Sequence, residues 1–110
     1  MNIDNAKLSI VMSEFNISIT NSMKDAAVKH FLSAGGQNIN ISIINVPGAF
    51  EIPGAVSALI KKSSSDIIVA IGCVIEGETP HFDYIATETT RAIMNMIIKN
   101  NIPIGFGVLT

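Results

Sequence analysis

The sequence predicts an α/β fold in which a four-stranded parallel sheet carries helices on both faces. Segments with strand-like hydrophobicity alternate with segments of helical periodicity, in the order β-α-β-α-β-α-β. The chain has twenty Ile against four Leu, which favours buried strands of β-branched residues. Its length of 110 residues fits one domain, spanning residues 1–110.

The first half is predicted to hold two strands and one helix. Residues 8–12 form a short apolar strand that ends in a polar turn. Apolar residues then recur every three or four positions over 19–34, which predicts a helix stopped by two glycines. A second strand is expected over 39–46, where Pro47 ends it.

The second half is predicted to hold two further helix–strand pairs. A helix over 52–62 has proline near its first turn and two lysines in its last. The continuous apolar run 67–75 is typical of a parallel strand covered on both faces. A third helix should begin near His81 and end near Asn100, and residues 102–110 form the fourth strand. No helix follows this strand, so we expect strand four and one face of the sheet to be exposed unless another subunit covers them.

Charge and composition narrow the range of functions. The net charge of −2 argues against nucleic acid as a partner, because phosphate neutralisation needs clustered cations. The longest apolar run is too short for a membrane span, and no secretory signal is recognisable, so we expect a soluble cytoplasmic protein. Two histidines and the buried-type Cys73 have no metal-ligand spacing, so no metal is predicted.

Ligands of open parallel sheets bind outside the carboxyl ends of the strands. The unusual residues of this chain collect in those segments: Phe15 and Asn16, then 47–51, then 77–81, then 106–110. Aromatic side chains there could stack on a planar ligand. Considered one at a time, Phe15, Phe50 and Phe106 would more often be buried side chains that close the end of the hydrophobic core.

The segment 77–81 opens a helix, where free backbone N–H groups attract anions. Thr79 can cap this helix, and a capped helix start without ligand is the simpler interpretation. The positive end of the helix dipole disfavours imidazolium at His81, which leaves a neutral ring as a proton acceptor. Glu51 opens the preceding helix, where it either caps the helix or binds ligand hydroxyls.

Three motifs in these segments resemble the 6,7-dimethyl-8-ribityllumazine synthase family. They are residues 46–53 (VPGAFEIP), 72–84 (GCVIEGETPHFDY) and 106–110 (FGVLT), and the aromatic-Asn pair at 15–16 also fits. The resemblance covers essentially the whole chain in order. It implies a flavodoxin-like three-layer domain that assembles into homo-oligomers, either pentamers or icosahedral shells of twelve pentamers.

The resemblance also implies a reaction of riboflavin biosynthesis without metal or organic cofactor. It condenses 5-amino-6-(D-ribitylamino)uracil with 3,4-dihydroxy-2-butanone 4-phosphate. By the family's pattern His81 is the catalytic proton shuttle, and the other site residues bind substrate. Phe15, beside Asn16, stacks on the pyrimidine; Ala49, Phe50 and Glu51 hold the ribityl chain; Val74 and Ile75 line the pyrimidine pocket; Gly77, Glu78 and Thr79 approach the phosphate; Phe106 reaches into the neighbouring subunit's site.

The family normally continues past this last strand into two helices, which carry an Arg, a Lys and an Asp of the active site. The 110 residues contain no counterpart of this part, and the only Arg, Arg91, lies away from the motifs. Two alternatives therefore stand beside an active synthase. One is a shortened family member that binds ligand or assembles but catalyses weakly, and the other is a flavodoxin-like binding module.

Overall fold

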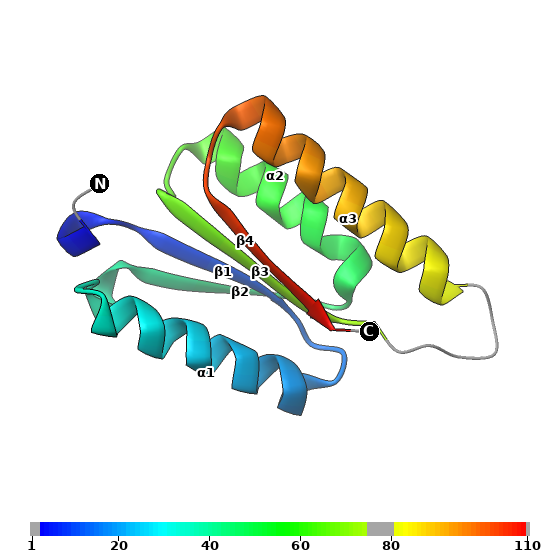
Figure 1. Ribbon diagram of the computed structural model, residues 1–110, viewed down its shortest axis with the longest axis horizontal. Coiled ribbons are helices and arrows are strands. Elements are labelled where there is room, and N and C mark those ends of the chain that lie inside the picture. Colours follow the sequence, from blue (N-terminus) through cyan, green and yellow to red (C-terminus); the bar gives the residue numbers. More distant parts are fainter. Residues whose placement is uncertain (1–2, 75–80, 110) are drawn as a thin grey trace.

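Four parallel strands form the sheet in a computed structural model, which describes residues 3–74 and 81–109. They are β1 (Leu8–Ser13), β2 (Ile41–Val46), β3 (Ile67–Cys73) and β4 (Ile104–Leu109). Figure 1 shows them side by side, in the order β2-β1-β3-β4. The predicted parallel sheet is confirmed, and β1, the first strand of the chain, lies inside it.

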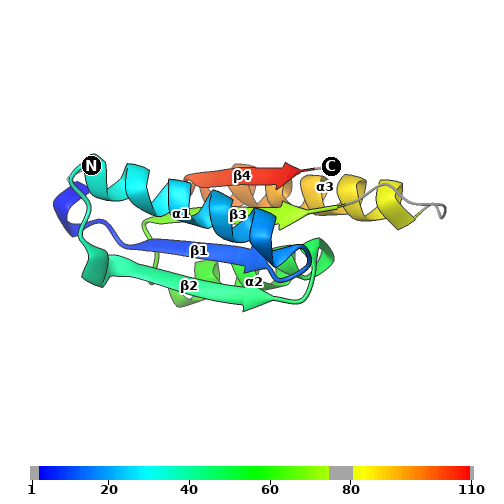
Figure 2. The ribbon, with the colours of Figure 1, turned by 90° about the horizontal axis from the view of Figure 1, so that it is seen from below.

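Helices cover both faces of this sheet. Helix α1 (Ile17–Ser33) lies on one face, and α2 (Ile52–Lys62) and α3 (His81–Asn100) lie on the other. Figure 2 shows the same three layers, with α1 in front of the strands and the other two helices behind. The flavodoxin-like α/β arrangement expected from the sequence is therefore the observed one.

The sheet separates two apolar clusters, and β1 contributes to both because its side chains alternate between the faces. Ile10 and Met12 pack with Phe31 of α1, whereas Val11 packs with Ile52 and other residues on the α2 and α3 side. All six residues of β1 are buried. Each such aliphatic side chain stabilises the fold by roughly 1.5–3 kcal/mol, so β1 anchors the loop that follows it.

Four strand boundaries differ from the sequence predictions. Strand β1 extends to Ser13, one residue beyond its predicted end. Strand β2 begins at Ile41 instead of residue 39, because Asn38–Asn40 form a 3-10 turn before the pairing of Leu8 with Ile41 begins. Strand β3 ends at Cys73, and Val74 follows it as irregular chain. Strand β4 begins at Ile104, since Pro103 before it has no N–H to donate to a ladder.

The edge of the sheet at β4 is exposed, as expected from the sequence. Gly105 and Phe106 are both solvent-exposed. Across the described residues, no helix is long and apolar enough to cross a membrane.

Candidate active site at the carboxyl ends of the strands

Backbone hydrogen bonds join the loops that follow β1 and β2. The N–H of Glu14 donates to the carbonyl of Val46 at 2.7 Å, and the N–H of Phe15 donates to the carbonyl of Pro47 at 3.2 Å. These bonds continue the parallel ladder beyond the ends of the two strands. They hold the loop with Phe15 alongside the segment that leads to Phe50.

Both of these phenylalanines face solvent. The side chain of Phe15 is 51% exposed and that of Phe50 is 60% exposed. Within one chain, the interpretation of these rings as plugs of the core is therefore wrong. Two exposed aromatic rings on neighbouring loops offer apolar faces to a planar ligand or to another subunit.

Asn16 connects the end of β1 to the end of β3. It has a left-handed backbone conformation (φ 56°), and its carbonyl accepts hydrogen bonds from the N–H groups of Ile19 and Thr20 in the first turn of α1. Its half-buried side chain donates from Nδ2 to Sγ of Cys73 at 3.6 Å. Left-handed backbone is more accessible to Asn than to most residues, which explains this residue type at the strand-to-helix turn.

The segment after β2 forms a short 3-10 helix, η3 (Ala49–Glu51), that leads into α2. Ala49 is buried, and its carbonyl accepts a long hydrogen bond of 3.4 Å from Oγ1 of Thr89 on α3. The neighbouring Glu51 is exposed and occupies the N-cap position of α2, but its side chain makes no capping hydrogen bond. Glu51 therefore does not cap α2 through a side-chain hydrogen bond. A Cβ atom at Gly48 would lie 3.3 Å from Oε2 of Glu51, so a residue without a side chain makes room for this carboxylate.

The third segment is described in part. Val74 is buried and belongs to the same apolar cluster as Ala49 and Ile52. Helix α3 begins at His81, which confirms the predicted place of this residue in a first helical turn. The predicted site residues Ile75, Gly77, Glu78 and Thr79 lie outside the described residues.

Phe106 lies apart from the other predicted site residues. It pairs with Ala70 of β3, and Ala70 pairs with Val11 of β1, so Phe106 is level with the middle of the sheet. Its strand β4 is separated from β1 by β3, about 10 Å at the usual strand spacing. The side chain is 38% exposed on the edge strand, where a second chain can reach it.

Two threonines that the sequence analysis did not single out hold the backbone of the site through hydrogen bonds. Oγ1 of Thr20 donates to the carbonyl of Ser13 at 2.9 Å, which ties α1 to the last residue of β1. Thr89 holds the carbonyl of Ala49, as described above. Both side chains are buried. The sequence could have indicated both bonds, because each Thr lies on the apolar face of a helix and a buried hydroxyl needs a hydrogen-bond partner.

Charged groups at this end are few among the described residues. Arg91 lies 4.0 Å from Glu88 on the exposed side of α3, consistent with the expectation that it is not a site residue. Over residues 3–74 and 81–109, no three His, Cys, Asp or Glu side chains gather as a metal site would require. The described loops of the site carry the carboxylates of Glu14 and Glu51, the amide of Asn16 and backbone groups.

Comparison with known proteins identifies the family. The sequence model of 6,7-dimethyl-8-ribityllumazine synthase matches residues 5–110. The enzyme of that name from Campylobacter jejuni (strain 81-176) is 46% identical over 111 residues, which cover 100% of this chain and 72% of the relative. The one from Nautilia profundicola is 46% identical over 106 residues (96% and 69%), and the one from Campylobacter hominis is 45% identical over 104 residues (94% and 67%). The match is thus continuous through every segment that contributes to the site, and the chain belongs to the 6,7-dimethyl-8-ribityllumazine synthase family.

Proposed function

We propose that this protein is a transferase that forms 6,7-dimethyl-8-ribityllumazine from 5-amino-6-(D-ribitylamino)uracil and 3,4-dihydroxy-2-butanone 4-phosphate. The reaction releases phosphate and water and belongs to riboflavin biosynthesis. The observation that carries the proposal is the family match over 5–110, which includes all of the loops at the carboxyl ends of the strands. We also propose that the protein is cytoplasmic.

The site residues divide the work between the two substrates. Phe15 stacks on the pyrimidine ring, and the exposed carboxylate of Glu51 accepts hydrogen bonds from ribityl hydroxyls, with Ala49 and Phe50 beside it. Backbone groups of Val74 and Ile75 contact the pyrimidine. The N-terminal region of α3, with Gly77, Glu78 and Thr79, binds the phosphate through backbone N–H groups.

Holding the two substrates together is the main catalytic contribution. The aromatic amine is already a nucleophile toward the ketone, so orientation and the entropy of bringing two molecules together dominate the barrier. Imine formation and phosphate elimination then need protons to be moved. A neutral His81 in the first turn of α3 supplies this general acid–base function.

The second chain of a homo-oligomer completes the site. Phe106 is exposed on an edge strand and lies away from Phe15 in the same chain, which supports a role at the site of a neighbour. We propose a pentamer, alone or as the unit of an icosahedral shell. Cyclic symmetry places the same edge against the same loop at every interface.

A rate measurement on purified protein tests the catalytic assignment. His81→Ala should lower kcat for lumazine formation by roughly 10²–10⁴ with little change in KM, as expected for the loss of a general acid–base group. His30→Ala is the matched control, since His30 is exposed in the last turn of α1. Equal kcat values for the two variants would refute the role of His81. No product from the unmodified chain would instead favour a family member that binds ligand without turnover.

A mixing experiment tests the shared site. Phe106→Ala and His81→Ala chains should each be weak alone, but unfolded together and refolded they should regain activity. In randomly mixed assemblies about a quarter of the interfaces combine an intact His81 with an intact Phe106 of the neighbour. Activity that stays at the level of the two separate variants would place Phe106 outside the neighbour's site.

A further inference from the structure

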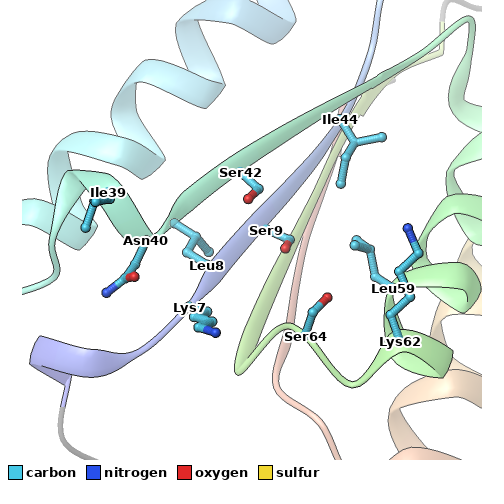
Figure 3. Close-up of a pocket in the computed structure, with 10 residues that line it drawn as sticks. All are labelled: Lys7, Leu8, Ser9, Ile39, Asn40, Ser42, Ile44, Leu59, Lys62 and Ser64. Atoms are coloured by element: carbon cyan, nitrogen blue, oxygen red, sulfur yellow. The ribbon is translucent and has the colours of Figure 1, made fainter.

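A groove of about 560 Å³ opens at the end of the sheet opposite the candidate active site. It lies at the amino ends of β1 and β2, beside the end of α2 (Figure 3). Apolar and polar side chains share its lining, and the ten residues are Lys7, Leu8, Ser9, Ile39, Asn40, Ser42, Ile44, Leu59, Lys62 and Ser64. Its volume falls in the range of pockets that hold small organic molecules, roughly 300–1,000 Å³.

The groove exists because α2 is short. The helix has 11 residues and ends at Lys62, where Ser63 takes a left-handed conformation and turns the chain away. Along the same face of the sheet, Val11 and Ile44 lie beneath the helix and its neighbours in the apolar cluster. Closer to the amino ends the same face carries Ser9 and Ser42, which are register partners. On this face of the sheet, the strand residues beneath the helices are apolar, whereas those beyond the end of α2 are Ser9 and Ser42.

Hydroxyl groups from three separate segments meet at this groove. Figure 3 shows the hydroxyls of Ser9 on β1, Ser42 on β2 and Ser64 after α2 around one hollow. Oγ of Ser9 shares a hydrogen bond of 2.6 Å with Oγ of Ser65, which fixes its position. Ser42 and Ser64 are exposed and have donor capacity for a ligand.

Two ammonium groups make the groove cationic. Lys7 and Lys62 line it, and none of the ten lining residues is acidic. The ion pairs of the described residues are Lys24 with Asp25 and Arg91 with Glu88, so neither lysine of the groove is in one. The nearby carboxylate of Asp66 accepts a hydrogen bond from the backbone N–H of Lys7 at 2.8 Å. Lys62 shares the last turn of α2 with Lys61, which lies outside the groove, and both offset the partial negative charge at this helix end.

We propose that this groove binds a phosphate monoester of a small organic molecule. Ammonium and hydroxyl donors that come from different directions suit the several oxygens of a tetrahedral dianion better than the two oxygens of a carboxylate. Ile44, Leu59 and the 87% exposed Ile39 give the organic part an apolar contact. Two lysines on a chain of net charge −2 suit a single small anion, whereas nucleic acid needs a larger cationic surface.

The first test observes the lysines directly. The intact protein is reductively methylated with ¹³C-formaldehyde, which preserves the charges, and its methyl resonances are assigned by Lys→Arg substitution. Phenyl phosphate should shift the Lys7 and Lys62 resonances saturably and leave Lys61 and Lys99 unmoved. Inorganic phosphate should act at the same two lysines with lower affinity, because it lacks the organic part. Parallel shifts at all four lysines would show general charge screening and overturn the proposal.

The second test compares variants of adjacent lysines. Lys62→Gln should weaken phenyl phosphate binding, read at Lys7, by about fivefold, the upper end for a solvent-exposed ion pair. Lys61→Gln, one residue away on the same helix end, should change it by less than about twofold. Ser42→Ala should weaken binding by about threefold through a lost hydrogen bond. Equal effects of the two lysine variants would contradict a site in the groove.

Two further measurements distinguish a ligand site in the groove from the catalytic site and from a contact between two copies of the chain. Lumazine formation by Lys62→Gln should match the unmodified protein, because the groove lies at the other end of the strands from the catalytic loops. Dilution of the ligand-free protein should leave the Lys7 and Lys62 resonances in place. Resonances that move on dilution would assign the groove to a second copy of the chain and overturn the proposal.

Discussion

The amide nitrogen Nδ2 of Asn16 lies 3.6 Å from Sγ of Cys73, and this contact joins the carboxyl ends of β1 and β3. The adjacent Phe15 is joined to the chain after β2 through the carbonyl of Pro47. One dipeptide therefore links three neighbouring strands at the level of the candidate active site. Cys73 is buried and Asn16 is half-buried, so the contact is partly shielded from solvent.

The backbone conformation of Asn16 can be tested separately from its side chain. We expect Asn16→Ala to lower the free energy of unfolding by about 1 kcal/mol more than Asn16→Gly, because left-handed backbone costs an L-residue about 1–2 kcal/mol. Urea denaturation at one fixed protein concentration measures the difference. Both variants lose the contact with Cys73, so equal stabilities would mean that the φ of 56° contributes nothing.

Thr20→Val should destabilise the protein by about 1–3 kcal/mol, because it leaves the buried carbonyl of Ser13 without its 2.9 Å hydrogen bond while keeping the shape of the side chain. Ser22→Ala is the control. It removes a bond of similar length to the carbonyl of Ser18 on the exposed side of the same helix, where water replaces the lost donor. A chemical denaturation series that gives the same loss for both would show that burial of the Thr20 bond is energetically irrelevant.

Ser13→Ala should be neutral or stabilising by up to about 1 kcal/mol. Its Oγ is buried, and no hydrogen-bond partner for it exists among the described residues. Removing an unpaired buried hydroxyl removes a desolvation cost. The melting temperature of Ser13→Ala should therefore equal or exceed that of the parent, and a clear decrease would reveal a partner for this hydroxyl.

Substitution by alanine should change the stability of the protein in opposite directions at two glycines, Gly36 and Gly54. A Cβ atom at Gly36 would lie 2.3 Å from Cε2 of Phe31, a buried ring, so Gly36→Ala should destabilise by about 2 kcal/mol or more through overpacking. Gly54 lies in α2 with nothing within 4 Å of such an atom. Gly54→Ala should stabilise by about 0.5–1 kcal/mol through helix propensity. Thermal unfolding of both variants checks the pair. A Gly36→Ala variant as stable as the parent would contradict the packing around Phe31, and a destabilised Gly54→Ala variant would contradict the open space at Gly54.

The strands and helices could be predicted because their hydrophobic periods differ, and one position shows where this signal ends. Ile39, Asn40 and Ile41 alternate as a strand does, yet Ile39 is 87% exposed and belongs to a 3-10 turn. Alternation specifies which residues can share a face, but it does not specify where a neighbouring strand begins. The pairing of Leu8 with Ile41 sets the start of β2, and that depends on tertiary structure.

The candidate site could be located from sequence because parallel sheets place ligands at the carboxyl ends of their strands. Its internal contacts could not. The strand order brings Asn16 to Cys73, 57 residues apart in the chain, and it moves Phe106 to an edge. Local patterns carry no information about either arrangement, which follows from how distant strands pair.

The position of β1 has a consequence for folding during synthesis. This strand is made first, yet Leu8 pairs with Ile41 and Ile67, which are 33 and 59 residues further along the chain. All six of its residues are buried in the finished fold, so the nascent chain exposes them until β2 and β3 have left the ribosome. At usual rates of about 5–20 residues per second this exposure lasts several seconds. A chain of this topology therefore folds late relative to its synthesis, and its first strand is the segment that chaperones have most reason to bind.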